Sequence, residues 1–113
     1  MSERDLPYLQ HVHDACSDIG EFVADGRDVA TRSKLILNAV VRQLLVVGEA
    51  VKRISPETKA LAPRVPWKQI AGMRDRLVHD YFDIVPEQVW NAAFKDIPVL
   101  KAEVEVLMNL LSR

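Results

Sequence analysis

The sequence predicts an all-α protein that forms one domain over residues 1–113, folded as an up-and-down bundle of four to five helices. Apolar residues recur at spacings of three and four along most of the chain, which is the period of amphipathic helices. Strand signals are nearly absent, because no Asn-Gly or Asp-Gly hairpin joins alternating runs and the chain has only 4 glycines. Hydrophobic residues make up 49% of the chain, which is enough for one compact core.

The first helix is predicted from Asp5 to about Ala24, followed by a break at residues 25–28. Its apolar positions lie on one face: Leu6, Leu9, Val12, Cys16, Ile19 and Val23. Cys16 is the only cysteine, so no disulfide can form within the chain, and we expect it to be a small core residue.

A second helix is predicted from an N-cap at Ser33 to about Ile54, and its wide apolar surface predicts the most buried helix of the bundle. Four polar residues form a line along one side of it: Asn38, Arg42, Glu49 and Arg53. This line is either an exposed stripe with a Glu49–Arg53 pair or a polar surface that faces a cleft. The spacing does not decide between the two.

Residues 55–65 are predicted to form a loop, because Ser55-Pro56 ends the second helix and further prolines follow. A third helix then runs from Pro66 or Trp67 to about residue 80.

A fourth helical stretch opens at Pro86, and a fifth helix is predicted with Asp96 as its cap and Pro98 in its first turn. Apolar residues at positions 97, 100, 104, 107 and 111 of this last helix suit packing along a neighbouring helix.

Composition excludes several classes of protein. No apolar run approaches the roughly 20 residues of a membrane span, and the N-terminal residues are too polar for a signal peptide. Together with the lone cysteine, this predicts a cytoplasmic protein with no membrane partner. No zinc-binding Cys/His cluster, Walker-type loop or Ser-His-Asp constellation is visible, so we expect neither a metal nor a cofactor.

The net charge of −1 hides a segregation along the chain. Residues 1–25 carry −5, residues 26–79 carry +7 and residues 80–113 carry −3. A basic middle between acidic ends is either an anion-binding surface, a self-complementary surface or a solvated face.

The segment from Gly72 to Phe82 concentrates arginines, aspartates, a histidine and a tyrosine beside an expected helix end. Metal-free RNA cleavage needs such groups, because histidine exchanges protons near neutral pH and arginine matches the oxygens of a phosphate. On one regular helix Arg74 and His79 would point about 140° apart. Either the helix loosens near His79, or a second copy completes the site, and we favour the second copy.

Purely structural roles are the alternative for the same residues. His79 would be a partner of the helix C-terminus, Arg74 and Arg76 a solvated rim, and Tyr81 a half-buried anchor.

Several stretches of the chain resemble the HepT-like HEPN family. Arg74, His79 and Tyr81 match its Arg-x4-His-x-Tyr motif. Residues 47–56 (VGEAVKRISP) are similar to its "IGEAvkrlsPe" stretch, and residues 66–74 (PWKQIAGMR) to its "PWreIiGMRn" stretch. Residues 89–90 and 96–101 resemble its closing "vW…DLPeLk" segment. The resemblance covers most of the chain in the right order and is highly specific.

The resemblance implies a HEPN-type helical homodimer with a metal-independent endoribonuclease site, built by Arg74 and His79 from both copies. It implies that the chain is the toxin of a toxin–antitoxin pair and that its substrate is RNA. The partner implied is a minimal nucleotidyltransferase (MntA-like) antitoxin, which silences the toxin by attaching AMP to the motif tyrosine, here Tyr81.

Other residues receive lesser roles in this hypothesis. The supporting residues are Asp75, Arg42 and Glu49, and the RNA-binding residues are Arg76, Lys52 and Arg53. The family often has Asn where this chain has Asp75, and a carboxylate there would either orient His79 or repel a phosphate. Two alternatives are an RNA- or nucleotide-binding module without turnover and a structural dimer that binds the nucleotidyltransferase.

Overall fold

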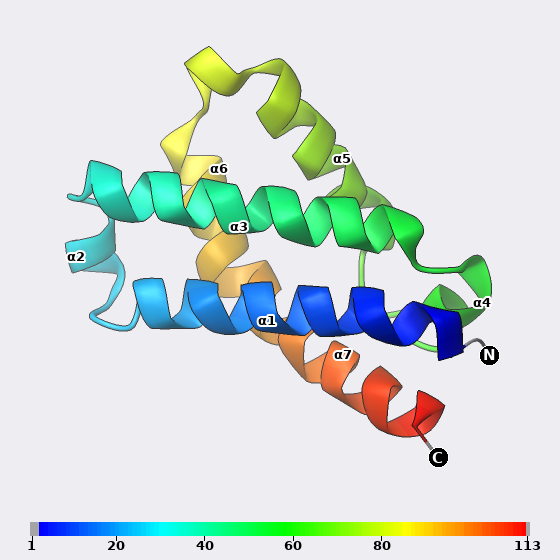
Figure 1. Cartoon of the computed structure of the whole chain (residues 1–113). Coiled ribbons are helices and arrows are strands. Elements are labelled where there is room, and N and C mark those ends of the chain that lie inside the picture. The colour runs from blue at the N-terminus through cyan, green and yellow to red at the C-terminus, as the bar shows by residue number, and fades with distance from the viewer. Residues whose placement is uncertain (1–2, 113) are drawn as a thin grey trace.

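The computed structural model describes residues 3–112, and every regular element in that range is helical (Figure 1). The elements are η1 (Glu3–Asp5), α1 (Leu6–Phe22), α2 (Arg27–Ala30), α3 (Lys34–Arg53), α4 (Pro56–Ala60), α5 (Trp67–His79), η2 (Tyr81–Asp83), α6 (Pro86–Asn91), η3 (Ala92–Asp96) and α7 (Ile97–Leu111). Here η1 and η2 are 3-10 turns and η3 is a π-helical turn. The predicted all-α fold is confirmed.

The four long helices form the body of the molecule. Helix α1 packs between α3 and α7, and α3 carries α5 on its other side (Figure 1). Leu9, Leu44 and Leu107 are among the side chains that are fully buried between these helices. Cys16 is 1% exposed, and burial raises the pKa of its thiol to about 12, so its prediction as a core residue is confirmed.

The apolar face of α7 packs along a neighbouring helix as predicted, and that neighbour is α1 of the same chain. Its residues Leu100, Val104 and Leu107 are at most 1% exposed. This face is therefore used by the core of one chain, and it gives no argument for a second copy.

Helix α3 begins as predicted, because the Ser33 side chain accepts a hydrogen bond of 3.1 Å from the backbone N–H of Ile36. The break predicted at residues 25–28 is confirmed only in its first half. Gly26 has a φ of +98°, which favours glycine, but α2 begins at Arg27. The loop predicted over residues 55–65 is partly wrong. Ser55 caps the short helix α4 by accepting from the N–H of Thr58 at 3.3 Å.

The predicted cap at Asp96 is wrong. Asp96 has helical backbone angles and makes no capping hydrogen bond, because α6, η3 and α7 run on as one helical stretch. Pro98 has no N–H to donate to the preceding turn, and the wider π turn accommodates this defect without ending the helix.

A buried carboxylate ties the start of the chain to the corner between α3 and α4. Asp5 is 3% exposed and accepts hydrogen bonds from Ser55 Oγ at 2.6 Å, Ser55 N at 3.1 Å and Thr58 Oγ1 at 2.5 Å. Burial alone would raise the pKa of Asp5, but these hydrogen bonds outweigh it and hold the pKa below its ordinary value. Among the described residues, no helix is long and apolar enough to cross a membrane.

Candidate active site

The motif arginine is seated where α3 and α5 approach most closely. Gly48 of α3 is buried directly against Arg74 of α5, and a Cβ added to Gly48 would lie 2.1 Å from the Cβ of Arg74. Real side chains do not approach so closely. Because Gly48 has no side chain, the backbone of α5 can lie close to α3 at Arg74, and this close approach positions the base of the Arg74 side chain.

The side chain of Arg74 belongs to an ionic cluster of five residues. Its Nη2 lies 3.2 Å from Oε2 of Glu49, and its Nη1 donates to Oδ1 of Asp75 at 3.1 Å. Lys52 also donates to Asp75, and Arg53 donates to Glu49 at 3.5 Å. Three cations thus surround two carboxylates. One residue of the polar line, Glu49, pairs with Arg74 of α5 and also forms the predicted pair with Arg53.

The cluster changes how Asp75 titrates. Hydrogen bonds from Lys52 and then Arg74 lower the pKa of Asp75, so its carboxylate is charged at neutral pH. Both terminal nitrogens of the Arg74 guanidinium face a carboxylate in this state.

His79 lies at the exposed end of α5, with 88% of its side chain accessible. Its Nδ1 lies 3.0 Å from Oδ1 of Asp80. A carboxylate oxygen accepts hydrogen bonds, so Asp80 can hold the imidazole ring through Nδ1. The carboxylate beside His79 is therefore Asp80, and not Asp75 as the sequence suggested. Asp80 was missed because its only signal is its place next to the motif histidine.

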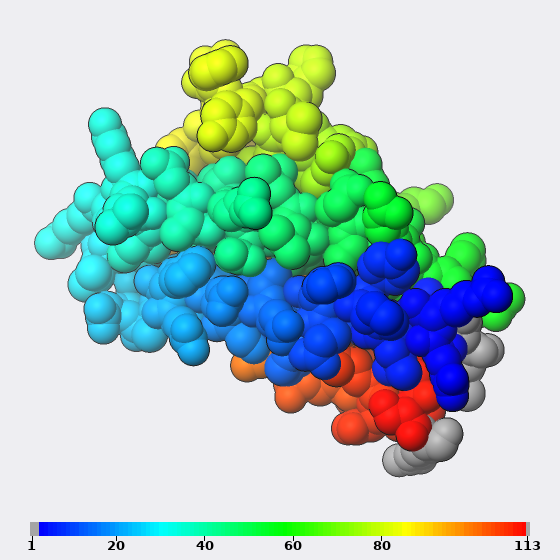
Figure 2. Space-filling model, in the orientation of Figure 1, coloured from blue at the N-terminus to red at the C-terminus, as the bar shows by residue number. Residues whose placement is uncertain are grey.

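Helix α5 continues unbroken to His79, so the loosening considered from the sequence does not occur. Arg74 turns toward α3, whereas His79 projects into solvent. Within one chain the structure does not bring these two side chains together. The end of α5 and the turn after it project from the body of the molecule (Figure 2).

The remaining candidates lie apart from the ionic cluster. Arg42 is exposed on α3 and has no side-chain partner within residues 3–112. Tyr81 is 59% exposed and meets Phe82 edge to face, with ring centroids 5.6 Å apart. Tyr81 is thus no anchor in the core. Arg76 lines a cavity on a different face of α5 from the one that Arg74 presents to α3.

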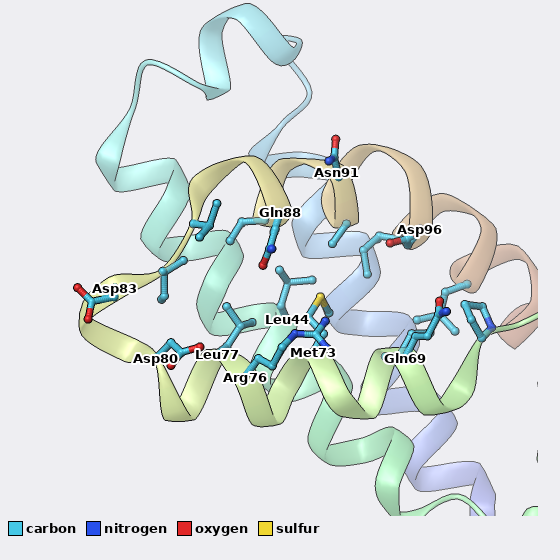
Figure 3. Close-up of a pocket in the computed structure, with 18 residues that line it drawn as sticks. Leu44, Gln69, Met73, Arg76, Leu77, Asp80, Asp83, Gln88, Asn91 and Asp96 are labelled. Atoms are coloured by element: carbon cyan, nitrogen blue, oxygen red, sulfur yellow. The ribbon is translucent and has the colours of Figure 1, made fainter.

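This cavity has a volume of about 570 Å³ and lies between α5 and the α6–η3–α7 stretch (Figure 3). Leu44 and Leu100 are among its apolar lining residues. Polar side chains also line it: Gln69, Arg76, Asp80, Asp83, Gln88, Asn91 and Asp96. Within residues 3–112, no three His, Cys, Asp or Glu side chains group closely enough to hold a metal ion.

Comparisons with known proteins identify the family. The family described as Ribonuclease HepT-like matches residues 12–107. A protein named "Putative RNase" from Caldanaerobacter subterraneus subsp. tengcongensis is 36% identical over 91% of this chain and 93% of its own length. A second protein of that name, from Methanocaldococcus jannaschii, is 37% identical over 96% of each chain.

"Probable ribonuclease HepT" from Thermococcus cleftensis is 36% identical over 88% of this chain and 92% of its own. No solved structure matches the chain significantly. The matched residues contain α3, α5 and the whole Arg-x4-His-x-Tyr segment. The chain therefore belongs to the HepT-like ribonuclease family.

Proposed function

We propose that this ribonuclease is the endonucleolytic toxin of a toxin–antitoxin pair, and that it cuts RNA without a metal ion through Arg74 and His79. The observation that carries the proposal is the position of His79. Its side chain is 88% exposed, and its Nδ1 lies 3.0 Å from Oδ1 of Asp80, a carboxylate that can hold the ring in place. An exposed histidine paired in this way can exchange a proton with a substrate hydroxyl.

The chemistry follows from these groups. Nε2 of His79 takes the proton from a 2′-hydroxyl, whose oxygen then bonds to the adjacent phosphorus. The bond from phosphorus to the 5′-oxygen breaks, and a protonated His79 returns a proton to that oxygen. The products are a 2′,3′-cyclic phosphate and a 5′-hydroxyl end. Arg74 binds the phosphoryl oxygens, on which negative charge grows in the transition state.

The separation of the two side chains supports a site shared by two copies. Because Arg74 and His79 diverge on one unbroken helix, we place the phosphate between Arg74 of one copy and the partner's His79 in a two-fold homodimer. Lys52, Arg53 and Arg76 would bind neighbouring phosphates of the RNA. Glu49 would hold Arg74 in place, and Asp75 would compete with the phosphate for Nη1 of Arg74.

The test is incubation of the purified protein with total RNA in the presence of EDTA. We expect cleavage with cyclic phosphate ends, and a loss of about 10²–10⁴-fold in His79→Ala, the usual effect of removing a positioned acid or base. The thermal midpoint should not change, since the side chain is 88% exposed. Equal cleavage by His79→Ala would contradict the proposal, and unfolding of this variant would identify His79 as a structural partner of the helix end.

Tyr81 is the proposed point of control by a minimal nucleotidyltransferase antitoxin, which would attach AMP to it. The tyrosine is 59% exposed and lies two residues after His79. An AMP group there would add a negative phosphodiester close to the site and would compete with RNA for the arginines.

Co-expression with such a nucleotidyltransferase and measurement of the intact mass tests this step. The mass should rise by one or more AMP units, and the increase should vanish in Tyr81→Phe. An unmodified protein, or an increase that persists in Tyr81→Phe, would leave complex formation as the means of neutralisation.

A further inference from the structure

We propose that Lys52 is a positioning residue of the candidate active site, and that it holds the Asp75 carboxylate so that Arg74 is free to bind the reacting phosphate. The role rests on the function proposed above, because it concerns how Arg74 is kept available to RNA. It differs from the phosphate contact of Lys52 named there, since it acts through Asp75 and needs the charge of that carboxylate.

Both terminal nitrogens of the Arg74 guanidinium are occupied in the folded chain. Nη2 lies 3.2 Å from Oε2 of Glu49, and Nη1 donates to Oδ1 of Asp75 at 3.1 Å. A guanidinium binds a phosphate best through two parallel N–H groups. RNA must therefore displace at least one carboxylate from Arg74 before two donors can face the phosphate.

Asp75 is the carboxylate on which two cations compete for one oxygen. Lys52 of α3 donates to Oδ1, the atom that also accepts from Arg74. The hydrogen bond from Lys52 lowers the pKa of Asp75 more than the hydrogen bond from Arg74 does. At Glu49 the contacts of Arg53 and Arg74 are with different oxygens, so neither excludes the other. Loss of Lys52 therefore leaves Oδ1 of Asp75 to Arg74.

The charges of the cluster match one to one when Arg74 turns away from it. Lys52 stays paired with Asp75, and Arg53 stays paired with Glu49, so neither carboxylate loses its last cation. Without Lys52, Arg74 is the one cation of the cluster that still pairs with Asp75. A phosphate would then compete with a carboxylate that has no other cation, and RNA would bind more weakly.

The fold places Lys52 for this role. Glu49 and Lys52 lie three residues apart on one face of α3, and α3 meets α5 where Gly48 is against Arg74. Lys52 also lies in the last turn of α3, where the helix dipole favours a cation. A purely structural role at this helix end predicts a loss of stability, without a change in RNA binding that depends on Asp75.

The test measures the dissociation constant of a single-stranded RNA oligonucleotide whose 2′-hydroxyls are methylated, so that it binds without being cut. Lys52→Met removes the ammonium and keeps an unbranched side chain. We expect Lys52→Met to weaken binding by a factor that is about two- to fivefold larger in the parent than in Asp75→Asn, the range for an exposed ion pair. This excess should shrink as salt is raised, because the pair is open to screening.

Lys34→Met is the matched control, because Lys34 is exposed on the same face of α3, about five turns before Lys52. It should change binding by the same factor with and without the charge of Asp75. Equal factors for Lys52→Met in the two backgrounds would overturn the proposal and leave Lys52 as a phosphate ligand only. A fall in unfolding free energy with unchanged binding would identify a structural cation at the helix end, and would also overturn it.

Titration of the Asp75 carboxyl by NMR, without RNA, checks the ion pair itself. The pKa of Asp75 should be higher in Lys52→Met than in the parent, because its main hydrogen-bond donor is lost. An unchanged pKa would contradict the proposed hold of Lys52 on Asp75.

Cleavage of total RNA in EDTA separates this proposal from the catalytic one. The excess effect of Lys52→Met on binding, in a protein that cuts no RNA, would sink the nuclease mechanism and keep the positioning role. Cleavage by the parent, together with equal factors for Lys52→Met in the two backgrounds, would do the reverse.

Discussion

Arg74 and His79 are held in very different ways, although they lie five residues apart. The Arg74 side chain is 30% exposed and pairs with carboxylates of two elements, whereas that of His79 is 88% exposed and, among residues 3–112, pairs only with Asp80. Under the proposed mechanism, a change at Arg74 therefore disturbs the joint between α3 and α5 as well as the chemistry. A change at His79 disturbs the chemistry alone under the same proposal.

Arg74→Lys should reduce kcat/KM for RNA by about ten- to a hundredfold, the effect of losing a hydrogen bond between charged groups. An ammonium cannot face Glu49 and Asp75 and also present a second donor to a phosphate. The measurement is steady-state cleavage of a short RNA, with Arg32→Lys on an exposed turn as the control. Wild-type rates in Arg74→Lys would mean that the guanidinium does not bind the reacting phosphate.

Asp75→Asn tests the carboxylate that stands where the family often has Asn. Removing its charge frees Nη1 of Arg74 and should lower KM for RNA by up to about fivefold, a typical limit for an exposed pair. The effect should shrink as salt is raised, because the pair is exposed to screening. Asp25→Asn removes the same charge elsewhere and should leave KM unchanged. A rise in KM for Asp75→Asn would show that Asp75 mainly positions Arg74.

The sequence predicted Arg74, His79 and Tyr81 because the order and spacing of a motif are visible in the chain. It could not predict which carboxylate holds His79. On an ideal helix Asp75 lies one turn before His79, but Lys52 of α3 draws Asp75 away. Whether Asp75 pairs with Lys52 or with His79 depends on how α3 packs on α5, and the sequence does not show this packing.

The joint between α3 and α5 depends on one glycine. Gly48 leaves no room for even a methyl group against Arg74. Gly20 of α1 lies in open space, with no atom within 4 Å of an added Cβ. The two helical glycines therefore form a matched pair for substitution.

Gly48→Ala should destabilise the fold by about 1–3 kcal/mol, the usual effect of overpacking, and reduce cleavage by up to about a hundredfold because Arg74 is displaced. Gly20→Ala should be neutral or stabilising by up to about 1 kcal/mol, as expected for an exposed helix position. Urea unfolding and cleavage assays measure both effects. If Gly48→Ala matches Gly20→Ala in stability and activity, the close approach does not position Arg74.

Helix positions were predicted well where the apolar period was long, and poorly where it was short. The long helix from Lys34 to Arg53 has both an apolar face and a cap at Ser33. Helix α4 has five residues, too few to show a period. No sequence signal marks the π turn before α7, and Asp96 followed by Pro98 resembled the start of a new helix.

In the molecule as a whole, Asp5 joins two segments 50 residues apart in the sequence. Asp5→Ala leaves the Ser55 and Thr58 donors without their acceptor and should cost about 2–3 kcal/mol of unfolding free energy near neutral pH. Because the folded pKa of Asp5 lies below its ordinary value of 3.8, the part of this stability that depends on the charge of Asp5 is complete above pH 3.8 and is lost as pH falls through the folded pKa.

Urea unfolding of the parent and of Asp5→Ala across the acid range measures this difference. The gap in unfolding free energy should be constant from neutral pH down to the ordinary pKa and should narrow at lower pH. A gap that is independent of pH to the acid limit would show that Asp5 acts through packing and not through its charge.

In the proposed dimer each site is shared by two copies of the chain, with Arg74 from one copy and His79 from the other. The test prepares mixed dimers from two differently tagged variants, Arg74→Ala and His79→Ala, isolated by both tags in turn. Each variant alone should be nearly inactive, and the mixed dimer should recover up to about half of the parent's activity, because one of its two sites then combines an intact Arg74 with an intact His79. A mixed dimer as inactive as either variant, or a parent that sediments only as a monomer while cutting RNA, would contradict a site built by two copies.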